Sequence, residues 1–90
     1  MRLPKYSGQF KLDVKQVEKR GKDMQKLRDV ITLILLGDTL PRELGDHPLK
    51  GEWKPNRDLH IEPDWVLIYT PNAEAVYFER TGTHSDIFSK

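Results

Sequence analysis

The first third of the chain has the apolar spacing of two amphipathic helices. Phe10, Val14 and Val17 recur every three to four residues, which places them on one face of a helix. Ser7 can cap the start of this helix, and Asp23 can cap a second one after a short connection. The apolar face of the second helix comprises Met24, Leu27, Val30, Ile31, Ile34 and Leu35. We therefore expect an antiparallel helical hairpin.

The second half of the chain has the patterns of strands. Apolar and polar residues alternate in 57–62, so Leu59 and Ile61 are expected to face a core. The polar residues of this strand are expected on its other side: Asp58, His60 and Glu62. A Pro–Asp turn then leads to residues 65–69, which are apolar throughout and typical of a central strand.

Two further strands complete the predicted sheet. Residues 75–81 alternate, although the pattern does not decide which of their faces is inner, and residues 3–6 can form a short edge strand. This order predicts an α+β fold: an N-terminal helical hairpin packed on one face of a mostly antiparallel sheet of about four to five strands. The other face of the sheet is expected to stay open. We expect residues 1–90 to form a single domain.

Composition and charge restrict the class of protein. There is no cysteine, which excludes disulfides and thiolate metal sites. There is neither a signal peptide nor an apolar run long enough to cross a bilayer, so we expect a cytoplasmic protein without membrane contact. Residues 1–28 carry nine Lys or Arg against three Asp or Glu, whereas residues 29–90 carry six against eleven. A basic first third suggests contact with a polyanion, although a solvated helix face explains the same charges.

Groups suited to proton transfer gather in the strand-rich half, which holds all three histidines: His47, His60 and His84. An imidazole can take up or release a proton near neutral pH, and cleavage of RNA by its own 2′-OH needs a base and an acid. Other residues can complete such a site, with Asp58 or Asp64 orienting a ring, Arg80 or Lys50 stabilising phosphate charge, and Trp65, Tyr69 or Phe88 stacking on bases. The histidine spacings match no zinc signature, so no metal or other cofactor is expected. The pattern alone supports an RNA-directed enzyme and a plain binding module equally.

Three blocks of the sequence resemble the YafQ branch of the RelE toxin superfamily. They are residues 46–53 (DHPLKGxW), residues 57–69 (RDLHIxPDWVLIY) and residues 80–88 (RTGTHSxxF). Two segments near the N-terminus, YSGQF and KDMxKL, are similar too, so the likeness covers nearly the whole chain in matching order and spacing.

The resemblance implies the toxin of a bacterial type II toxin–antitoxin pair, a ribosome-dependent mRNA endonuclease that cuts the codon in the ribosomal A site. The implied chemistry is metal-independent acid–base catalysis that leaves a 2′,3′-cyclic phosphate or 3′-phosphate and a 5′-hydroxyl. The implied catalytic set is His47, His60, Asp64 and His84, supported by Asp58, Trp65, Arg80 and Phe88. Which histidine acts as base and which as acid is left open.

The resemblance also implies partners. The mRNA would be bound in the A site of the 70S ribosome, whose RNA the basic helices would contact through Lys11, Lys15 and Lys19. A DinJ-like antitoxin of the ribbon-helix-helix type would bind the toxin and carry it to operator DNA.

Two alternatives share the expected fold. A ParE-like toxin would block DNA gyrase and cut nothing, and a binding-only member would have lost its activity. The three histidines favour the nuclease over the gyrase inhibitor, because an inhibitor needs no proton-transfer groups.

Overall fold

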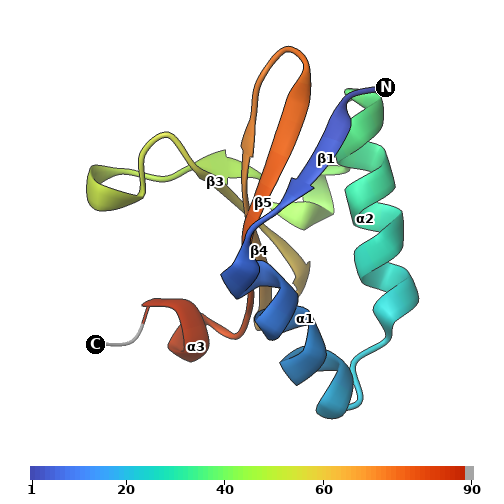
Figure 1. Ribbon diagram of the computed structural model, residues 1–90, viewed down its shortest axis with the longest axis vertical. Coiled ribbons are helices and arrows are strands. Elements are labelled where there is room, and N and C mark those ends of the chain that lie inside the picture. Colours follow the sequence, from blue (N-terminus) through green and yellow to red (C-terminus); the bar gives the residue numbers. More distant parts are fainter. Residues whose placement is uncertain (89–90) are drawn as a thin grey trace.

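The computed structural model describes residues 1–88, which form three α-helices and one five-stranded sheet (Figure 1). The helices are α1 (Gly8–Lys19), α2 (Met24–Leu36) and α3 (His84–Phe88). The strands are β1 (Leu3–Tyr6), β2 (His47–Pro48), β3 (Arg57–Glu62), β4 (Trp65–Pro71) and β5 (Ala75–Gly82). Two short 3-10 helices, η1 (Arg42–Leu44) and η2 (Gly51–Trp53), flank β2.

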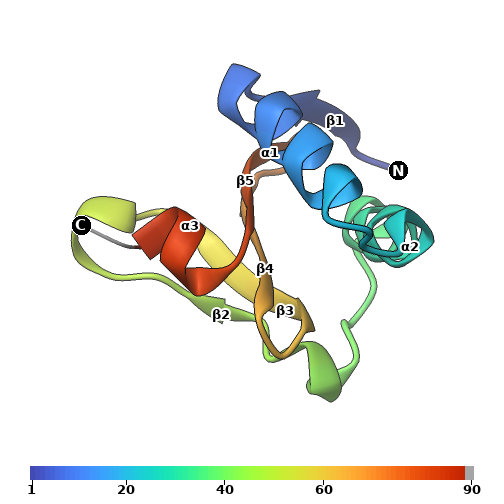
Figure 2. The same ribbon diagram turned by 90° about the horizontal axis from the view of Figure 1, so that it is seen from below.

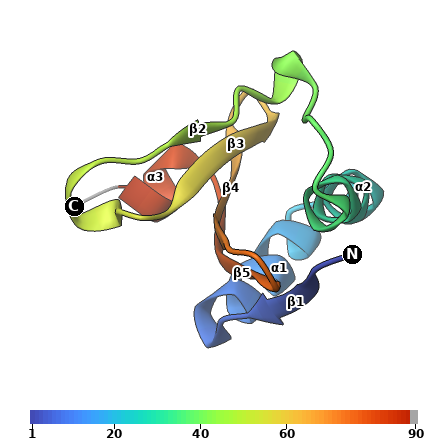
Figure 3. The ribbon, with the colours of Figure 1, turned by 90° about the horizontal axis from the view of Figure 1, so that it is seen from above.

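The sheet has the strand order β1-β5-β4-β3-β2, which places the apolar β4 at the centre as its sequence predicts. Strand β1 runs parallel to β5 at one edge, where the proline at position 4 is tolerated, and all other neighbours are antiparallel. Figure 3 shows β2 and β3 at one end of the sheet and β5 and β1 at the other. The predicted α+β class with a mostly antiparallel sheet is confirmed.

Both N-terminal helices begin at the predicted caps. The Ser7 hydroxyl oxygen accepts a hydrogen bond from the Phe10 amide at 2.9 Å, and Asp23 accepts one from the Gln25 amide at 3.0 Å. Helix α2 ends at Gly37, whose φ of 78° lies in the left-handed region that favours glycine. The two helices follow each other through a short connection and run in opposite directions (Figure 1).

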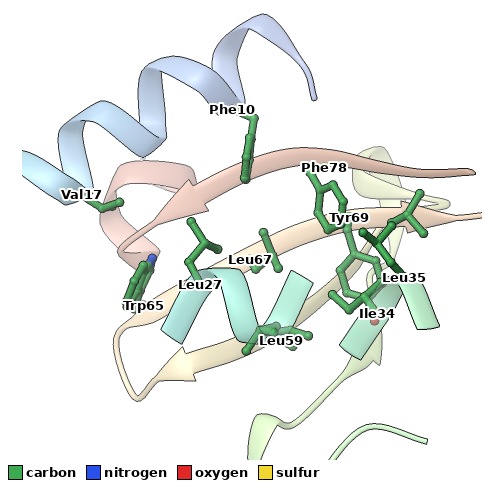
Figure 4. Close-up of a cluster of buried hydrophobic side chains, with 12 residues drawn as sticks. Phe10, Val17, Leu27, Ile34, Leu35, Leu59, Trp65, Leu67, Tyr69 and Phe78 are labelled. Atoms are coloured by element: carbon green, nitrogen blue, oxygen red, sulfur yellow. The ribbon is translucent and has the colours of Figure 1, made fainter. Parts of the chain in front are cut away.

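The main core lies between α1, α2 and one face of the sheet (Figure 4). Its buried side chains come from both helices and three strands: Phe10, Val17, Leu27, Val30, Ile34, Leu35, Leu59, Trp65, Leu67, Tyr69, Val76 and Phe78. Ile61 packs against this cluster, as the alternation in β3 predicts. Full burial of one such side chain contributes about 1.5–3 kcal/mol, so this cluster is the main source of stability.

The opposite face of the sheet is not left open, contrary to the prediction. Val66 and Ile68 of β4 form a second buried cluster with Ile87 of α3. Three partly buried side chains pack against it: Leu49, Trp53 and Phe88. Figure 2 shows α3 on the side of the sheet away from α1 and α2. Strand β4 is apolar on both faces, so it needs cover on both, and α3 with η2 supplies the second.

Candidate active site

His84 begins α3 and is anchored to the turn between β3 and β4. In that turn, Asp64 Oδ1 accepts two hydrogen bonds from His84, one from ring Nδ1 at 2.9 Å and one from the backbone amide at 3.2 Å. The side-chain bond, followed by the backbone bond, lowers the pKa of the Asp64 carboxyl below its usual value. Because a carboxylate only accepts, Nδ1 of His84 is the nitrogen that carries a proton here.

The other ring nitrogen of His84 meets His60, which projects from β3. The two Nε2 atoms are 3.3 Å apart, and the ring centroids are 5.2 Å apart. Two nitrogens at this distance need a proton on one and a lone pair on the other. A neutral His84 accepts from His60 at Nε2, and a doubly protonated His84 donates to it. The pair can therefore take up a proton and release it, which general acid–base catalysis requires.

His47 lies on β2, directly opposite Asp58 of β3. Its Nδ1 donates to the Gly45 carbonyl at 2.8 Å and is 3.3 Å from Asp58 Oδ1. Asp58 is 4% exposed, and within residues 1–88 its Oδ1 accepts no hydrogen bond, although the His47 ring lies 3.3 Å from it. Alternation along β3 puts His60 on the same side as Asp58. All three histidines therefore lie on β3 or against a residue of β3.

Of two further candidate residues, Phe88 lies beside this cluster and Lys50 lies in a nearby part of the sequence, after β2. Phe88 has its ring centroid 6.2 Å from that of His84 and 5.1 Å from that of Trp53. Lys50 is exposed in the loop between β2 and η2. The ring of Phe88 beside His84 fits the predicted stacking on a base, and the predicted phosphate contact of Lys50 stays a prediction.

Three of the residues predicted to support the site have structural contacts instead. Trp65 is 1% exposed and its indole N–H donates to the Thr81 hydroxyl at 2.9 Å, while Tyr69 is 3% exposed, so neither ring has a face available to a base. The predicted stacking by these residues is therefore wrong. Arg80 donates from Nε to the buried Asp13 of α1 at 2.7 Å, which ties α1 to β5. Its contacts do not support the predicted role in holding RNA.

Sequence reasoning missed Asp46, which lies directly before His47. Its carboxylate accepts a hydrogen bond from Arg57 Nη2 at 2.8 Å and one from the Tyr69 hydroxyl. Burial, followed by the neighbouring Asp46, raises the pKa of Tyr69 above its usual value, so the hydroxyl remains a donor. Asp46 opens the first block that resembles the family, but no local pattern pairs it with Arg57 or Tyr69.

Five lysines of the first third, at positions 11, 15, 19, 22 and 26, divide into two groups. Lys22 and Lys26 both bind Glu62 of β3, at 3.0 and 2.9 Å, and their hydrogen bonds lower the pKa of the Glu62 carboxyl, with that to Lys26 the larger cause. The exposed lysines of α1 are Lys11, Lys15 and Lys19. Two of these, at 11 and 15, border an apolar groove of about 470 Å³ between α1 and α2.

Within residues 1–88, no three His, Asp or Glu side chains are grouped so that they could hold a metal ion. The independence of the activity from metal stays a prediction. In the same part of the chain, no helix is both long and apolar enough to cross a membrane.

A helical hairpin on a mostly antiparallel sheet, with an Asp–His–His cluster beside it, is the arrangement expected for the toxin family that the sequence resembles. Residues 2–89 match the family model described as the bacterial toxin of type II toxin–antitoxin systems, YafQ. The chain belongs to the YafQ family.

Known relatives agree in sequence and in structure. The mRNA interferase toxin YafQ of Escherichia coli K12 is 53% identical over 85 residues, which cover 92% of this chain and 91% of that protein. In a crystal structure of the E. coli DinJ–YafQ toxin–antitoxin complex, the matching chain has a TM-score of 0.90 at 50% identity, with 97% of each chain covered. A metal-bound toxin from Helicobacter pylori has a TM-score of 0.91 at 32% identity, covering 98% of this chain and 100% of that one. An mRNA interferase is an endoribonuclease, so this is a family of enzymes.

Proposed function

We propose that the protein cleaves mRNA on the ribosome, at the codon in the A site, by metal-independent acid–base catalysis. The contact of His84 with both Asp64 and His60 carries the proposal, because it joins an anchored imidazole to a second proton carrier. The name of the E. coli relative, mRNA interferase toxin, supports the same class of reaction.

The proposed reaction is transesterification of RNA. A ring nitrogen of the cluster takes the proton of the 2′-OH, the 2′ oxygen attacks the adjacent phosphorus, and the bond from phosphorus to the 5′ oxygen breaks. A protonated ring nitrogen supplies the proton to the leaving oxygen, so the products are a 2′,3′-cyclic phosphate and a 5′-hydroxyl. Lys50 and His47 are assigned to the developing phosphate charge, and Phe88 to a base.

The partners follow from the charge of the surface and from the relatives. The exposed lysines at 11, 15 and 19 of α1 are assigned to ribosomal RNA, since they carry no carboxylate partner among the salt bridges of residues 1–88. The E. coli relative was crystallised in a complex with DinJ, which supports a DinJ-like antitoxin for this chain. The proposed location is the bacterial cytoplasm, where translating ribosomes are found, and operator DNA is contacted through the antitoxin.

The test is to map the 5′ ends of transcripts after brief expression and in a cell-free translation system with and without ribosomes. We expect new 5′-hydroxyl ends within codons only where ribosomes translate. If the protein instead inhibits supercoiling by gyrase and leaves mRNA intact, the nuclease proposal is wrong and the protein is a gyrase inhibitor.

The site itself is tested by His84→Ala, which we expect to slow cleavage by about 10²–10⁴-fold, the range for loss of a general acid or base. Ser85→Ala is the matched control, because Ser85 is the exposed neighbour of His84 on α3. A His84→Ala variant that folds like the control and cleaves as fast would overturn the assignment.

A further inference from the structure

The carboxylate of Asp46 joins the loop before β2 to two strands. It accepts hydrogen bonds from Arg57 of β3, with Nε at 3.3 and 3.2 Å from its two oxygens and Nη2 at 2.8 Å, and from the hydroxyl of Tyr69 in β4. The Asp46 and Arg57 side chains are only 20% and 32% exposed, and Tyr69 is buried. A bidentate pair of this kind fixes direction as well as distance.

Gly45, the residue directly before Asp46, contacts two of the histidines. The Gly45 carbonyl accepts from His47 Nδ1 at 2.8 Å. Gly45 also lies against His60, since a Cβ at this position would be 3.5 Å from His60 Nδ1. The placement of residues 45–47 therefore sets how the His47 ring meets Asp58 and how closely the loop approaches His60.

The sheet itself holds this segment weakly. Strand β2 has only two paired residues, His47 opposite Asp58 and Pro48 opposite Arg57, and proline has no N–H to donate. Directly after β2, the Leu49 amide donates to the Asn56 carbonyl at 2.9 Å, so these backbone contacts hold the chain from His47 onward and not the residues before it. The three donors on Asp46 act at the position directly before His47 and hold that part of the chain.

We propose that Asp46 is a positioning residue, which with Arg57 and Tyr69 fixes residues 45–47 so that His47 faces Asp58 beside the histidine pair. The inference rests on the proposed function in so far as His47 takes part in cleavage. Asp46 acts through His47, because its carboxylate is directed at Arg57 and Tyr69 and is not available to RNA. Loss of the hydrogen bonds between Asp46, Arg57 and Tyr69 should therefore lower the rate of the chemical step and leave RNA binding intact.

The experiment compares Asp46→Asn with wild type in cleavage of ribosome-bound mRNA, and follows the His47 ring by NMR in the free toxin. We expect kcat to fall by about 10–100-fold, as for a small displacement of a catalytic group, with KM unchanged. The His47 ring signals should shift and broaden, while those of His84, anchored by Asp64, should stay. Tyr69→Phe keeps the Arg57 pair and should have a smaller effect. Val30→Ala, a core change in α2, controls for loss of stability.

A second measurement places Asp46→Asn in a His47→Ala background, where it should lower kcat no further. If the loss persists there undiminished, or if the His47 signals stay unchanged in Asp46→Asn, the inference is overturned. Wild-type kcat in Asp46→Asn beside an inactive His47→Ala overturns the inference and leaves the proposed function intact. Full activity of His47→Ala removes His47 from the proposed mechanism, and the NMR spectra then decide the positioning alone.

Discussion

Asp13 provides a direct test of whether Arg80 is a structural residue. Its carboxylate is 4% exposed and accepts from Arg80 Nε at 2.7 Å, from the Thr81 amide at 3.1 Å and from the Gln9 side chain at 3.0 Å. The perturbation is Asp13→Ala, which removes all of these acceptors at once. Asp13→Asn is the milder variant, because its amide oxygen can still accept from Thr81.

The donors left behind determine the expected loss of stability. Thr81 is 1% exposed, and a buried amide without a partner costs about 1–3 kcal/mol. The Arg80 side chain is 24% exposed, so it regains part of its hydration, and its charge-assisted bond contributes about 1.5–3 kcal/mol. We expect Asp13→Ala to lower the free energy of unfolding by about 3–5 kcal/mol, as for other broken buried ion pairs, and Asp13→Asn by about half as much.

Urea unfolding followed by circular dichroism measures this loss. With an m-value of about 1 kcal/mol/M for a chain of this size, Asp13→Asn should lower the midpoint by about 1.5–2.5 M. Glu18→Ala, at an exposed position of the same helix, is the control and should change stability by less than about 0.5 kcal/mol. Arg80→Ala should be destabilised too, and its effect should be non-additive with that of Asp13→Ala.

The reasoning is refuted if Asp13→Ala unfolds at nearly the wild-type midpoint. It is also refuted if Arg80→Ala keeps full stability but loses RNA binding, which would restore the predicted role of Arg80 at the substrate.

Three further predictions concern pH, metal and surface charge. The Arg20 side chain, followed by the Thr83 amide, lowers the pKa of the Asp86 carboxyl, so this group stabilises the fold above about pH 4 and its contribution fades as pH falls further. The melting temperature of Asp86→Asn should therefore depend less on pH than that of wild type between about pH 2 and 4, and parallel curves would contradict this. A chelator should leave cleavage unchanged, whereas a loss that zinc restores would establish a metal requirement. Changing Lys11, Lys15 and Lys19 to Glu should weaken ribosome binding and flatten its salt dependence in sedimentation assays; unchanged binding would make them a solvated face.

Features encoded by neighbouring residues could be predicted from the sequence. Ser7 and Asp23 cap helices through bonds to amides two or three residues away, so the whole signal lies within one turn. The alternation in β3 likewise places Leu59 and Ile61 in the core without knowledge of the partner strands. The apolar sequence of β4 predicted its central place in the sheet. The same sequence indicates a second buried cluster, because Val66 and Ile68 alternate with residues of the main core and therefore face the opposite side.

Features that depend on pairing between distant segments could not be predicted. In β5, Arg80 pairs with Ile68 but Phe78 pairs with Tyr69, so a bulge shifts Thr81 to the side of Leu67. Strict alternation has no means of locating such a bulge. Asp13 is 67 residues from its partner Arg80, and nothing near either residue marks the pair as buried. The pair of Asp46 with Arg57 was missed for the same reason.

The sequence indicated which residues are candidates for the site, but it did not indicate how they are arranged. The residue types and the family resemblance identified the histidines, but the contact of His60 with His84 requires α3 to fold back along the sheet face that was expected to stay open. The same helix brings Phe88 beside the cluster and buries Ile87. The wrong expectation of an open face and the contact between His60 and His84 thus concern one element, α3.

Under the proposed mechanism, the hydrogen bonds that anchor the histidine rings also limit which ring nitrogens can exchange a proton with the RNA. Both His47 and His84 donate through Nδ1, to the Gly45 carbonyl and to Asp64, so each ring has Nε2 left for proton transfer. In the free protein, Nε2 of His84 is occupied by His60 at 3.3 Å. An RNA oxygen that exchanges a proton with this atom must therefore part the two rings, and the 47% exposure of the His84 side chain leaves room for that approach. Since His84 is tied by two bonds to Asp64, His60 is the ring expected to move.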